Sequence, residues 1–341
     1  MAYSHNAPFR ADVVGSYLRP AELKAAREDF AAGKIDAAAL KAVEDKAITE
    51  LVAKQKAAGL HVITDGEFRR GWWHFDFMWG FNGVDHAAAA HRVAFHEDEN
   101  TVARQTMPSP AQTRFVLTGN AAAYPYDEFY KNDDELTADI VAAYRQVIAD
   151  LYAAGCRNVQ FDDCTWTRLC DASVRERLGW SDEDALRLQQ ENLDVINAVI
   201  ADQPDDLVIN THVCRGNFHS TWLSSGGYAP VAAKLFGEEN VDAYYLEFDD
   251  DRSGDFAPLA EVSGDKKVVL GLITSKKPDL EDPDTIKARI QEAAQYIPLD
   301  RLCLSTQCGF ASTQEGNKLT EDQQWAKIAL VQSIAKDVWG E

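Results

Sequence analysis

The sequence predicts an α/β protein built as a (β/α)8 barrel, or TIM barrel, and three observations support this. Short β-rich runs alternate with long helical stretches along the chain, which is typical of βα units around a parallel sheet. Eight such runs can be counted, the number that closes this barrel. No internal repeat and no linker rich in proline, glycine or serine divides the 341 residues, so we expect a single catalytic domain over residues 1–341.

The predicted strands are short runs rich in β-branched, aromatic and aliphatic residues. Residues 208–214, for example, read Val-Ile-Asn-Thr-His-Val-Cys, which is typical of the end of a buried strand. In chain order the eight runs lie at residues 12–16, 61–66, 114–119, 158–163, 207–212, 243–248, 267–273 and 301–306.

Amphipathic stretches with helical spacing separate several of these runs. Several begin after Ser, Thr or Asp, residues whose side-chain oxygens cap the free N–H groups of a helix N-terminus. The clearest stretches lie at residues 36–58, 134–154, 181–201, 282–296 and 321–338.

A long insertion follows the second predicted strand. Residues 67–113 are rich in aromatic residues and histidine and have no clear helical period. We predict an excursion at the C-terminal face of the barrel, where insertions often shape substrate access. The aromatic run at 72–79 is interpreted as a small packed core, with ligand stacking as the alternative.

Composition excludes several classes of function. The formal net charge of −21 and the isoelectric point near 4.7 oppose binding to the phosphates of nucleic acid. No apolar run is long enough to span a membrane, and the first twenty residues lack a secretion signal pattern. Six cysteines spread over this length do not resemble a disulfide framework. We therefore expect a cytoplasmic enzyme acting on small molecules.

Polar residues with metal-ligand chemistry gather where the predicted strands end. His212 and Cys214 are two residues apart, so their side chains point the same way on a strand. Glu247 ends the next predicted strand and Cys308 follows the last, which gives one imidazole, two thiolates and one carboxylate. Zinc accepts this mixed set of ligands. The alternative is a hydrogen-bonded core histidine beside small buried cysteines.

The ordered set of motifs resembles the cobalamin-independent methionine synthases, specifically short homologues that contain only the C-terminal catalytic barrel. The matching pieces are Val14-Gly15-Ser16, Asp65-Gly66-Glu67, Phe161-Asp162-Asp163, His212-Val213-Cys214, Glu247 and Gln307-Cys308-Gly309. The resemblance implies a Zn2+ ion held by His212, Cys214, Glu247 and Cys308, and methylation of homocysteine to methionine. It also implies that Glu67 and Asp162 bind the amino group of homocysteine and that the backbone around Ser16 receives its carboxylate.

Physical chemistry supports this set of residues independently. A free thiol has a pKa of about 8.5, so little of it is thiolate at neutral pH, and zinc coordination removes the proton. Two carboxylates near an ammonium group select an amino-acid thiol over a neutral one. Glu67 and Asp162 could instead cap helices or pair with Arg69 and Arg70.

The methyl donor stays open between 5-methyltetrahydrofolate and another carrier such as a methyl-corrinoid. The full-length family carries a histidine after the seventh strand that is thought to assist proton delivery, whereas this chain offers Thr274 or Ser275. Lys276 and Lys277 are interpreted as solvated, with contact to an anionic donor as the alternative. Alternative functions are a zinc alkyltransferase of the epoxide:thiol type and a non-catalytic zinc- or thiol-binding barrel. A homodimer is also possible.

Overall fold

The structure is a computed structural model that describes residues 7–82, 84, 107–119 and 126–340. Within these residues, five strands form one parallel sheet in the order β1-β2-β3-β4-β5. They are β1 (Asn158–Asp163), β2 (Val208–Val213), β3 (Ala243–Glu247), β4 (Lys267–Ile273) and β5 (Leu302–Thr306). Two of the predicted strands match these bounds to the residue, and three match within one residue at each end.

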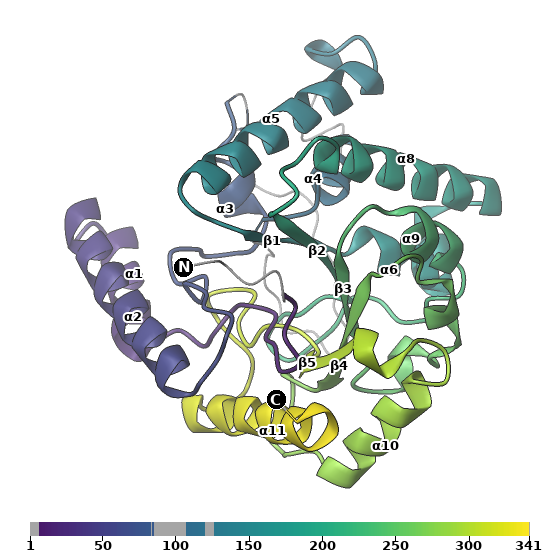
Figure 1. The fold of residues 1–341 in the computed structure, drawn as a ribbon. Coiled ribbons are helices and arrows are strands. Elements are labelled where there is room, and N and C mark those ends of the chain that lie inside the picture. Colours follow the sequence, from purple (N-terminus) through teal and green to yellow (C-terminus); the bar gives the residue numbers. More distant parts are fainter. Residues whose placement is uncertain (1–6, 83, 85–106, 120–125, 341) are drawn as a thin grey trace.

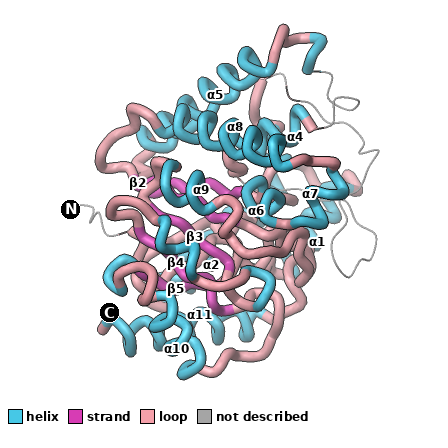
Figure 2. Tube along the Cα trace, turned by 90° about the vertical axis from the view of Figure 1, so that its right-hand side faces the viewer, coloured by secondary structure: helices cyan, strands magenta, loops and turns pink. Residues whose placement is uncertain are grey.

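Helices surround the strands in Figure 1, and Figure 2 shows the strands enclosed within this outer layer. All five predicted helical stretches are helices, with ends within three residues of the prediction. The α-helices are α1 (Ala21–Ala31), α2 (Ala37–Ala57), α3 (Phe75–Met78), α4 (Pro110–Thr118), α5 (Asp133–Ala153), α6 (Thr165–Cys170), α7 (Ala172–Leu178), α8 (Asp182–Ile200), α9 (Ala232–Glu238), α10 (Pro283–Ala293) and α11 (Glu321–Trp339). Four short 3-10 helices lie at Tyr126–Glu128, Asp251–Ser253, Ala257–Glu261 and Leu299–Arg301.

The first predicted strand, at 12–16, runs beside β5 without forming a strand. Ala11 makes an isolated parallel bridge to Leu304, and the N–H of Asp12 donates to the Leu304 carbonyl at 2.9 Å. The carboxylate of Asp12 then accepts from the N–H of Val13 at 2.7 Å. The N–H of Val13 is therefore paired with a side chain and not with a neighbouring strand, so the prediction of a strand at 12–16 is wrong. The segment does lie beside the last strand, as the barrel prediction requires.

The second predicted strand, at 61–66, is also irregular. The buried side chain of Gln55 donates to the Thr64 carbonyl at 2.8 Å and accepts from the Thr64 N–H at 3.0 Å. The Thr64 hydroxyl donates to the carbonyl of Gly15 at 2.6 Å. The segment therefore lies beside the first one, but side chains from α2 and from the segment itself replace the strand ladder.

The third predicted strand, at 114–119, is wrong because those residues belong largely to α4. The backbone beside β1 comes earlier. The N–H of Asp162 donates to the Met107 carbonyl at 3.3 Å, and the N–H of Ser109 donates back to the Asp162 carbonyl at 2.8 Å. Ser109 then caps α4, with proline at the first helical position. The Ser-Pro pair is the sequence signal that indicates this helix.

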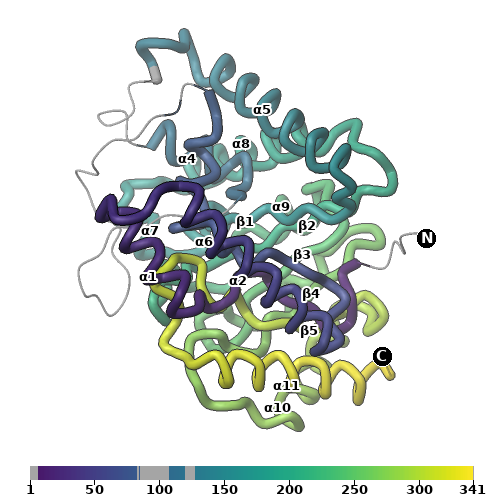
Figure 3. The backbone as a smooth tube through the Cα atoms, turned by 90° about the vertical axis from the view of Figure 1, so that its left-hand side faces the viewer, coloured from purple at the N-terminus to yellow at the C-terminus, as the bar shows by residue number. Residues whose placement is uncertain are grey.

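These segments continue the sheet beyond both of its edges, since 11–12 lie against β5 and 107–109 lie against β1. The side chain of Gln160 in β1 donates to the carbonyl of Val14 at 2.9 Å. This bond joins β1, at one edge of the sheet, to the segment that lies against β5 at the other edge. The α/β fold with a parallel sheet enclosed by helices agrees with the predicted barrel class. Figure 3 shows α1 and α2 side by side, with α11 and α10 below them.

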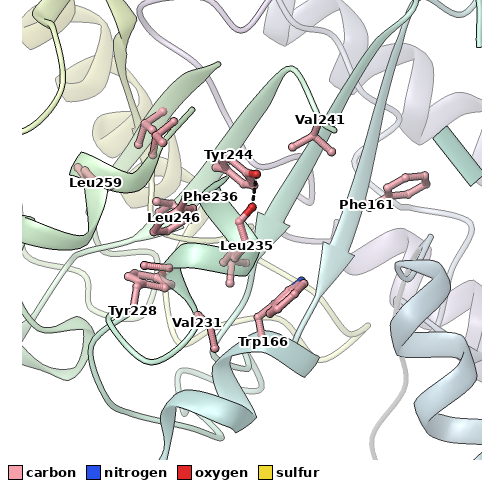
Figure 4. Packing of buried hydrophobic residues seen from close by; sticks show 14 of the residues in the cluster. Phe161, Trp166, Tyr228, Val231, Leu235, Phe236, Val241, Tyr244, Leu246 and Leu259 are labelled. Atoms are coloured by element: carbon pink, nitrogen blue, oxygen red, sulfur yellow. Dashed lines mark hydrogen bonds between the residues drawn. The ribbon is translucent and has the colours of Figure 1, made fainter. Parts of the chain in front are cut away.

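A large hydrophobic core packs between the sheet and its outer helices. Figure 4 shows part of it, in which the Tyr244 hydroxyl donates to the carbonyl of Leu235 and so ties β3 to α9. Of two smaller clusters, one contains four cysteines, which are Cys164, Cys214, Cys303 and Cys308. No helix among the described residues has the length and apolar character needed to cross a membrane.

The described beginning of the predicted 67–113 insertion pairs with the loop after β5. Trp72 forms an antiparallel bridge with Thr313, and the N–H of Gln314 donates to the carbonyl of Gly71 at 2.7 Å. Residues 83 and 85–106 lie outside the described part of the chain. The extent of the insertion and the single-domain organisation stay predictions.

Candidate functional site

The four predicted metal ligands meet at one end of the sheet. The imidazole, carboxylate and thiol ligand atoms of His212, Cys214, Glu247 and Cys308 all lie within 4.8 Å of one another, and all four residues are buried. His212 lies in β2, Cys214 follows that strand, Glu247 ends β3 and Cys308 follows β5. Parallel strands bring residues distant in the sequence to one end of the sheet, which explains how they converge.

The backbone orients the histidine. The Nδ1–H of His212 donates to the carbonyl of Tyr245 at 3.2 Å, and Nε2 has no hydrogen-bond partner among the described residues. A ring whose Nδ1 carries the proton keeps a lone pair on Nε2, the arrangement of a metal-binding histidine. Burial lowers the pKa of His212, but the negative groups Cys308 and Glu247 outweigh burial and raise it.

Glu247 is fully buried, and only one of its two carboxylate oxygens has a hydrogen-bond partner among the described residues. Its Oε1 accepts from the N–H of Arg215 at 2.8 Å, while Oε2 has no hydrogen-bond partner among the described residues. The guanidinium of Arg252 lies 3.8 Å from Oε2. A buried carboxylate oxygen left without a hydrogen bond is costly, so Oε2 is suited to a cation.

The thiols face one another. The sulfur atoms of Cys214 and Cys308 are 3.9 Å apart, and the N–H of Gly216 donates to the sulfur of Cys214 at 3.3 Å. A hydrogen bond with Cys164 is the largest cause that raises the pKa of Cys214, and a hydrogen bond with Cys214 does the same for Cys308. This pocket therefore disfavours two thiolates unless a positive charge is placed between them. Cys164 also lines this pocket, beside Cys214.

The two predicted substrate carboxylates lie close enough to influence each other, and one of them is on the strand next to His212. Strand register pairs Asp162 of β1 with His212 of β2. Burial and the charge of Asp162 raise the pKa of Glu67 to about 7, although Arg70 opposes them. An ammonium group placed between the two carboxylates would relieve this repulsion.

Glu67 has a left-handed backbone conformation, with φ of 63°. This conformation is uncommon for a residue with a side chain and is typically maintained by its surroundings at functional sites. Here the N–H of Glu67 donates to Asp65 at 2.8 Å, and the buried guanidinium of Arg19 donates to the Glu67 carbonyl at 2.8 Å. The turn thus holds the carboxylate by backbone contacts on both sides.

Ser16 packs against the loop that carries Cys308. Its hydroxyl accepts from the N–H of Ala311 at 3.2 Å, and its carbonyl accepts from the N–H of Phe310 at 3.0 Å. A Cβ at Gly309 would lie only 1.8 Å from the Ser16 hydroxyl oxygen. Only glycine allows this close approach, so Ser16 and the Cys308 loop are positioned together.

The segment after β4 differs from its sequence interpretation. The Ser275 hydroxyl is buried and donates to Gln307 and to the carbonyl of Gly309, at 3.0 and 2.9 Å. Lys276, predicted to be solvated, is only 5% exposed, whereas Lys277 is exposed as expected. The burial of Lys276 was missed because nothing in a Lys-Lys pair indicates which side chain turns inward.

Comparison with known proteins places this chain in a family. A family model described as "Cobalamin-independent synthase, Catalytic domain" matches residues 9–84 and 88–330. The uncharacterized protein YxjH of Bacillus subtilis is 44% identical over 98% of this chain and 95% of its own length. A methionine synthase of Saccharolobus solfataricus is 23% identical, over 87% of this chain and 86% of its own.

A solved structure leads to the same conclusion. The crystal structure of a putative vitamin-B12 independent methionine synthase from Listeria monocytogenes superposes with a TM-score of 0.75 and 39% identity, covering 98% of this chain and 99% of that one. The family match, the similarity of relatives over nearly the whole chain and the shared fold agree. This chain therefore belongs to the cobalamin-independent synthase catalytic-domain family.

Proposed function

We propose that this protein is a zinc-dependent methyltransferase that methylates homocysteine to methionine. The observation that carries the proposal is the convergence of His212, Cys214, Glu247 and Cys308, whose ligand atoms lie within 4.8 Å of one another in a buried pocket. Membership in the cobalamin-independent synthase family supports methyl transfer as the reaction class.

The residues fit a zinc ion on two counts. His212 Nε2 and Glu247 Oε2 are buried and have no hydrogen-bond partner among the described residues, so both are available as ligand atoms. The set of one nitrogen, one oxygen and two sulfurs matches the ligands that zinc accepts in tetrahedral sites. Zinc bound by these residues would supply Lewis acidity, which makes a substrate thiol a thiolate at neutral pH.

Other residues would bind and orient the amino acid. Asp162, on the strand next to His212, and Glu67, whose carboxylate interacts with it, would form a receptor for the ammonium group of homocysteine. Ser16 lies against the Cys308 loop, where its surrounding backbone would receive the substrate carboxylate. Holding both ends of the amino acid would fix its sulfur toward the metal ligands and reduce the entropy lost in reaching the reactive geometry.

The methyl donor belongs to the same proposal as either a methyl-folate or a methyl-corrinoid. Ser275 does not offer a free proton donor, because its hydroxyl already donates to Gln307 and the carbonyl of Gly309. Each donor must therefore be assayed separately.

Methionine formation from homocysteine is measured with 5-methyltetrahydrofolate, methylcobalamin and a simple methyl donor. Turnover with one of them supports the proposal, and no methionine from any of them contradicts it.

The choice of thiol is tested with analogues of homocysteine. If Glu67 and Asp162 bind the ammonium group, an analogue without it should react far more slowly, by about 100-fold or more. The Glu67→Gln variant should lose this discrimination. Equal rates for homocysteine and the analogue would assign the same zinc chemistry to another thiol, as in the alkyltransferase alternative.

A further inference from the structure

Lys276 is a buried cation at the same end of the sheet as the metal ligands. It follows β4 and is 5% exposed. Its ammonium group donates to the carbonyl of Gly216 at 3.1 Å and to the side-chain oxygen of Asn217 at 2.8 Å. Both acceptors are neutral, and no carboxylate among the described residues forms an ion pair with this ammonium group. A buried cation without a counter-ion is costly, so its position requires an explanation.

One contact leads to the first thiol. The N–H of Gly216 donates to the sulfur of Cys214 at 3.3 Å, while the carbonyl of the same residue accepts from Lys276. The lysine therefore holds the peptide that supports this sulfur atom. Moving the ammonium group would free Gly216 to turn away from Cys214.

The other contact leads to the second thiol. The amide of Asn217 donates to the carbonyl of Gly309 at 2.7 Å and to the Ser312 hydroxyl at 3.0 Å. Gly309 is next to Cys308 in the chain, and the Ser312 oxygen lies 3.8 Å from the Cys308 sulfur. Lys276 thus links the loops behind both thiols through the single residue pair 216–217.

Charge gives the same residue a second role. Two thiolates and a carboxylate carry three negative charges against the two positive charges of a zinc ion, so the centre is anionic. Lys276 lies within two hydrogen-bonded contacts of Cys214 and adds a buried positive charge near this centre, besides the Arg252 guanidinium that lies 3.8 Å from Glu247. In a buried setting such a charge acts at longer range than in water.

We propose that Lys276 is a positioning residue of this metal centre, holding the loops behind Cys214 and Cys308 and adding to the positive charge of Arg252 in offsetting the excess of negative ligands. This inference rests on the proposed zinc site but not on the identity of the thiol or the methyl donor. It adds a residue outside the four ligands to the group that determines metal affinity.

The test compares two neighbouring lysines by the same substitution. Lys276→Met and Lys277→Met remove the same charge, but only Lys276 is buried. Zinc affinity is measured by competition with a chelator, with no thiol or methyl donor present. Loss of a supporting contact to a metal ligand typically costs 10–100-fold in affinity, so Lys276→Met should bind zinc about 10–100-fold more weakly than Lys277→Met. Equal affinity of the two variants would overturn the inference.

A third variant separates charge from packing. Methionine matches the lysine stem in size and removes its charge, whereas Lys276→Arg restores a cation and donors in a bulkier side chain. The inference predicts tighter zinc binding by the Arg variant than by the Met variant, with circular dichroism showing that both are folded. If Lys276 only filled space, the Met variant would bind zinc more tightly than the Arg variant, and that result would also overturn the inference. Absence of zinc binding by the unmodified protein would instead refute the proposed function itself.

Discussion

Glu67 shows how a single residue combines strain, charge and recognition. Its backbone is left-handed, with φ of 63°, and Arg19 donates to its carbonyl at 2.8 Å. Its carboxylate lies in a setting that raises its pKa to about 7, chiefly by burial and by the charge of Asp162. Backbone strain and a strongly shifted carboxylate at one residue are typical of a site shaped for a ligand rather than for stability.

The raised pKa of Glu67 makes stability depend on pH. The folded protein binds this proton more tightly than the unfolded chain, whose pKa is near 4.5, so stability falls as pH rises from there through about 7. Glu67→Gln should therefore be more stable than the unmodified protein at pH 8, by about 1–2 kcal/mol, and the gain should shrink at pH 5. Thermal denaturation at the two pH values measures it. Glu50→Gln, on the exposed face of α2, serves as the control.

Gly309 controls the distance between Ser16 and the Cys308 loop. Since a Cβ there would meet the Ser16 oxygen at 1.8 Å, Gly309→Ala must push the two segments apart. We expect the KM for homocysteine to rise by about tenfold or more, because small displacements of substrate-positioning groups are costly. Steady-state kinetics give this value. Gly237→Ala is the matched control, as its Cβ would meet nothing closer than 4.0 Å, and a KM unchanged in both variants would contradict the prediction.

At the scale of elements, the sequence predicts strands well where strand pairing alone satisfies the backbone. β1 and β4 match their predictions to the residue, and both are flanked by other strands or by backbone-paired segments. The segment at 61–66 fails because the side chain of Gln55 satisfies the peptide groups of Thr64. No local pattern in the sequence could show that a helix residue would replace a strand ladder.

The 114–119 error has a different cause. Residues such as Phe115 and Val116 favour strands by composition, but Ser109 and Pro110 begin a helix upstream of them. The capping pair should have been given more weight than composition. The convergence of the four proposed metal ligands was predictable because each lies at or just after the end of a correctly predicted strand. The burial of Lys276, by contrast, depends on tertiary contacts that the sequence does not reveal.

Tyr144 of α5 holds the backbone beside β1 in place. Its hydroxyl donates to the Pro108 carbonyl at 2.7 Å and lies 2.7 Å from the Thr113 hydroxyl, in a fully buried position. Tyr144→Phe leaves those partners without their hydrogen bond and should cost about 1–3 kcal/mol of stability. Urea denaturation measures the loss. The control is Tyr130→Phe, because the Tyr130 hydroxyl donates to Asp139 at an exposed position. This variant should change stability by far less than Tyr144→Phe.

At the scale of the whole molecule, the proposed metal site joins segments from distant parts of the chain. Cys214 and Cys308 are 94 residues apart in the sequence but their sulfurs lie 3.9 Å apart, and the Lys276 contacts add the β4 segment to the same unit. A ligand that binds these residues only when they are assembled must stabilise the folded state as a whole.

Zinc should therefore raise the melting temperature. At a free zinc concentration 100 times Kd, the gain in stability is about 2.7 kcal/mol for the unmodified protein. Cys308→Ser should lose most of this gain, whereas Cys156→Ser should keep it, because the Cys156 thiol only donates to the carbonyl of Asn158. Scanning calorimetry with and without zinc compares the three proteins. An equal zinc effect in all three would show that the metal binds elsewhere.

The central claim is that the four converging residues hold a zinc ion that accepts the substrate thiol. Zinc-edge X-ray absorption of the metal-loaded protein, recorded before and after homocysteine is added, tests it most directly. The account predicts one zinc per chain with two sulfur neighbours, and a third sulfur once homocysteine is present. A sulfur count that stays the same on adding homocysteine, or a zinc without cysteine sulfur around it, would contradict the account.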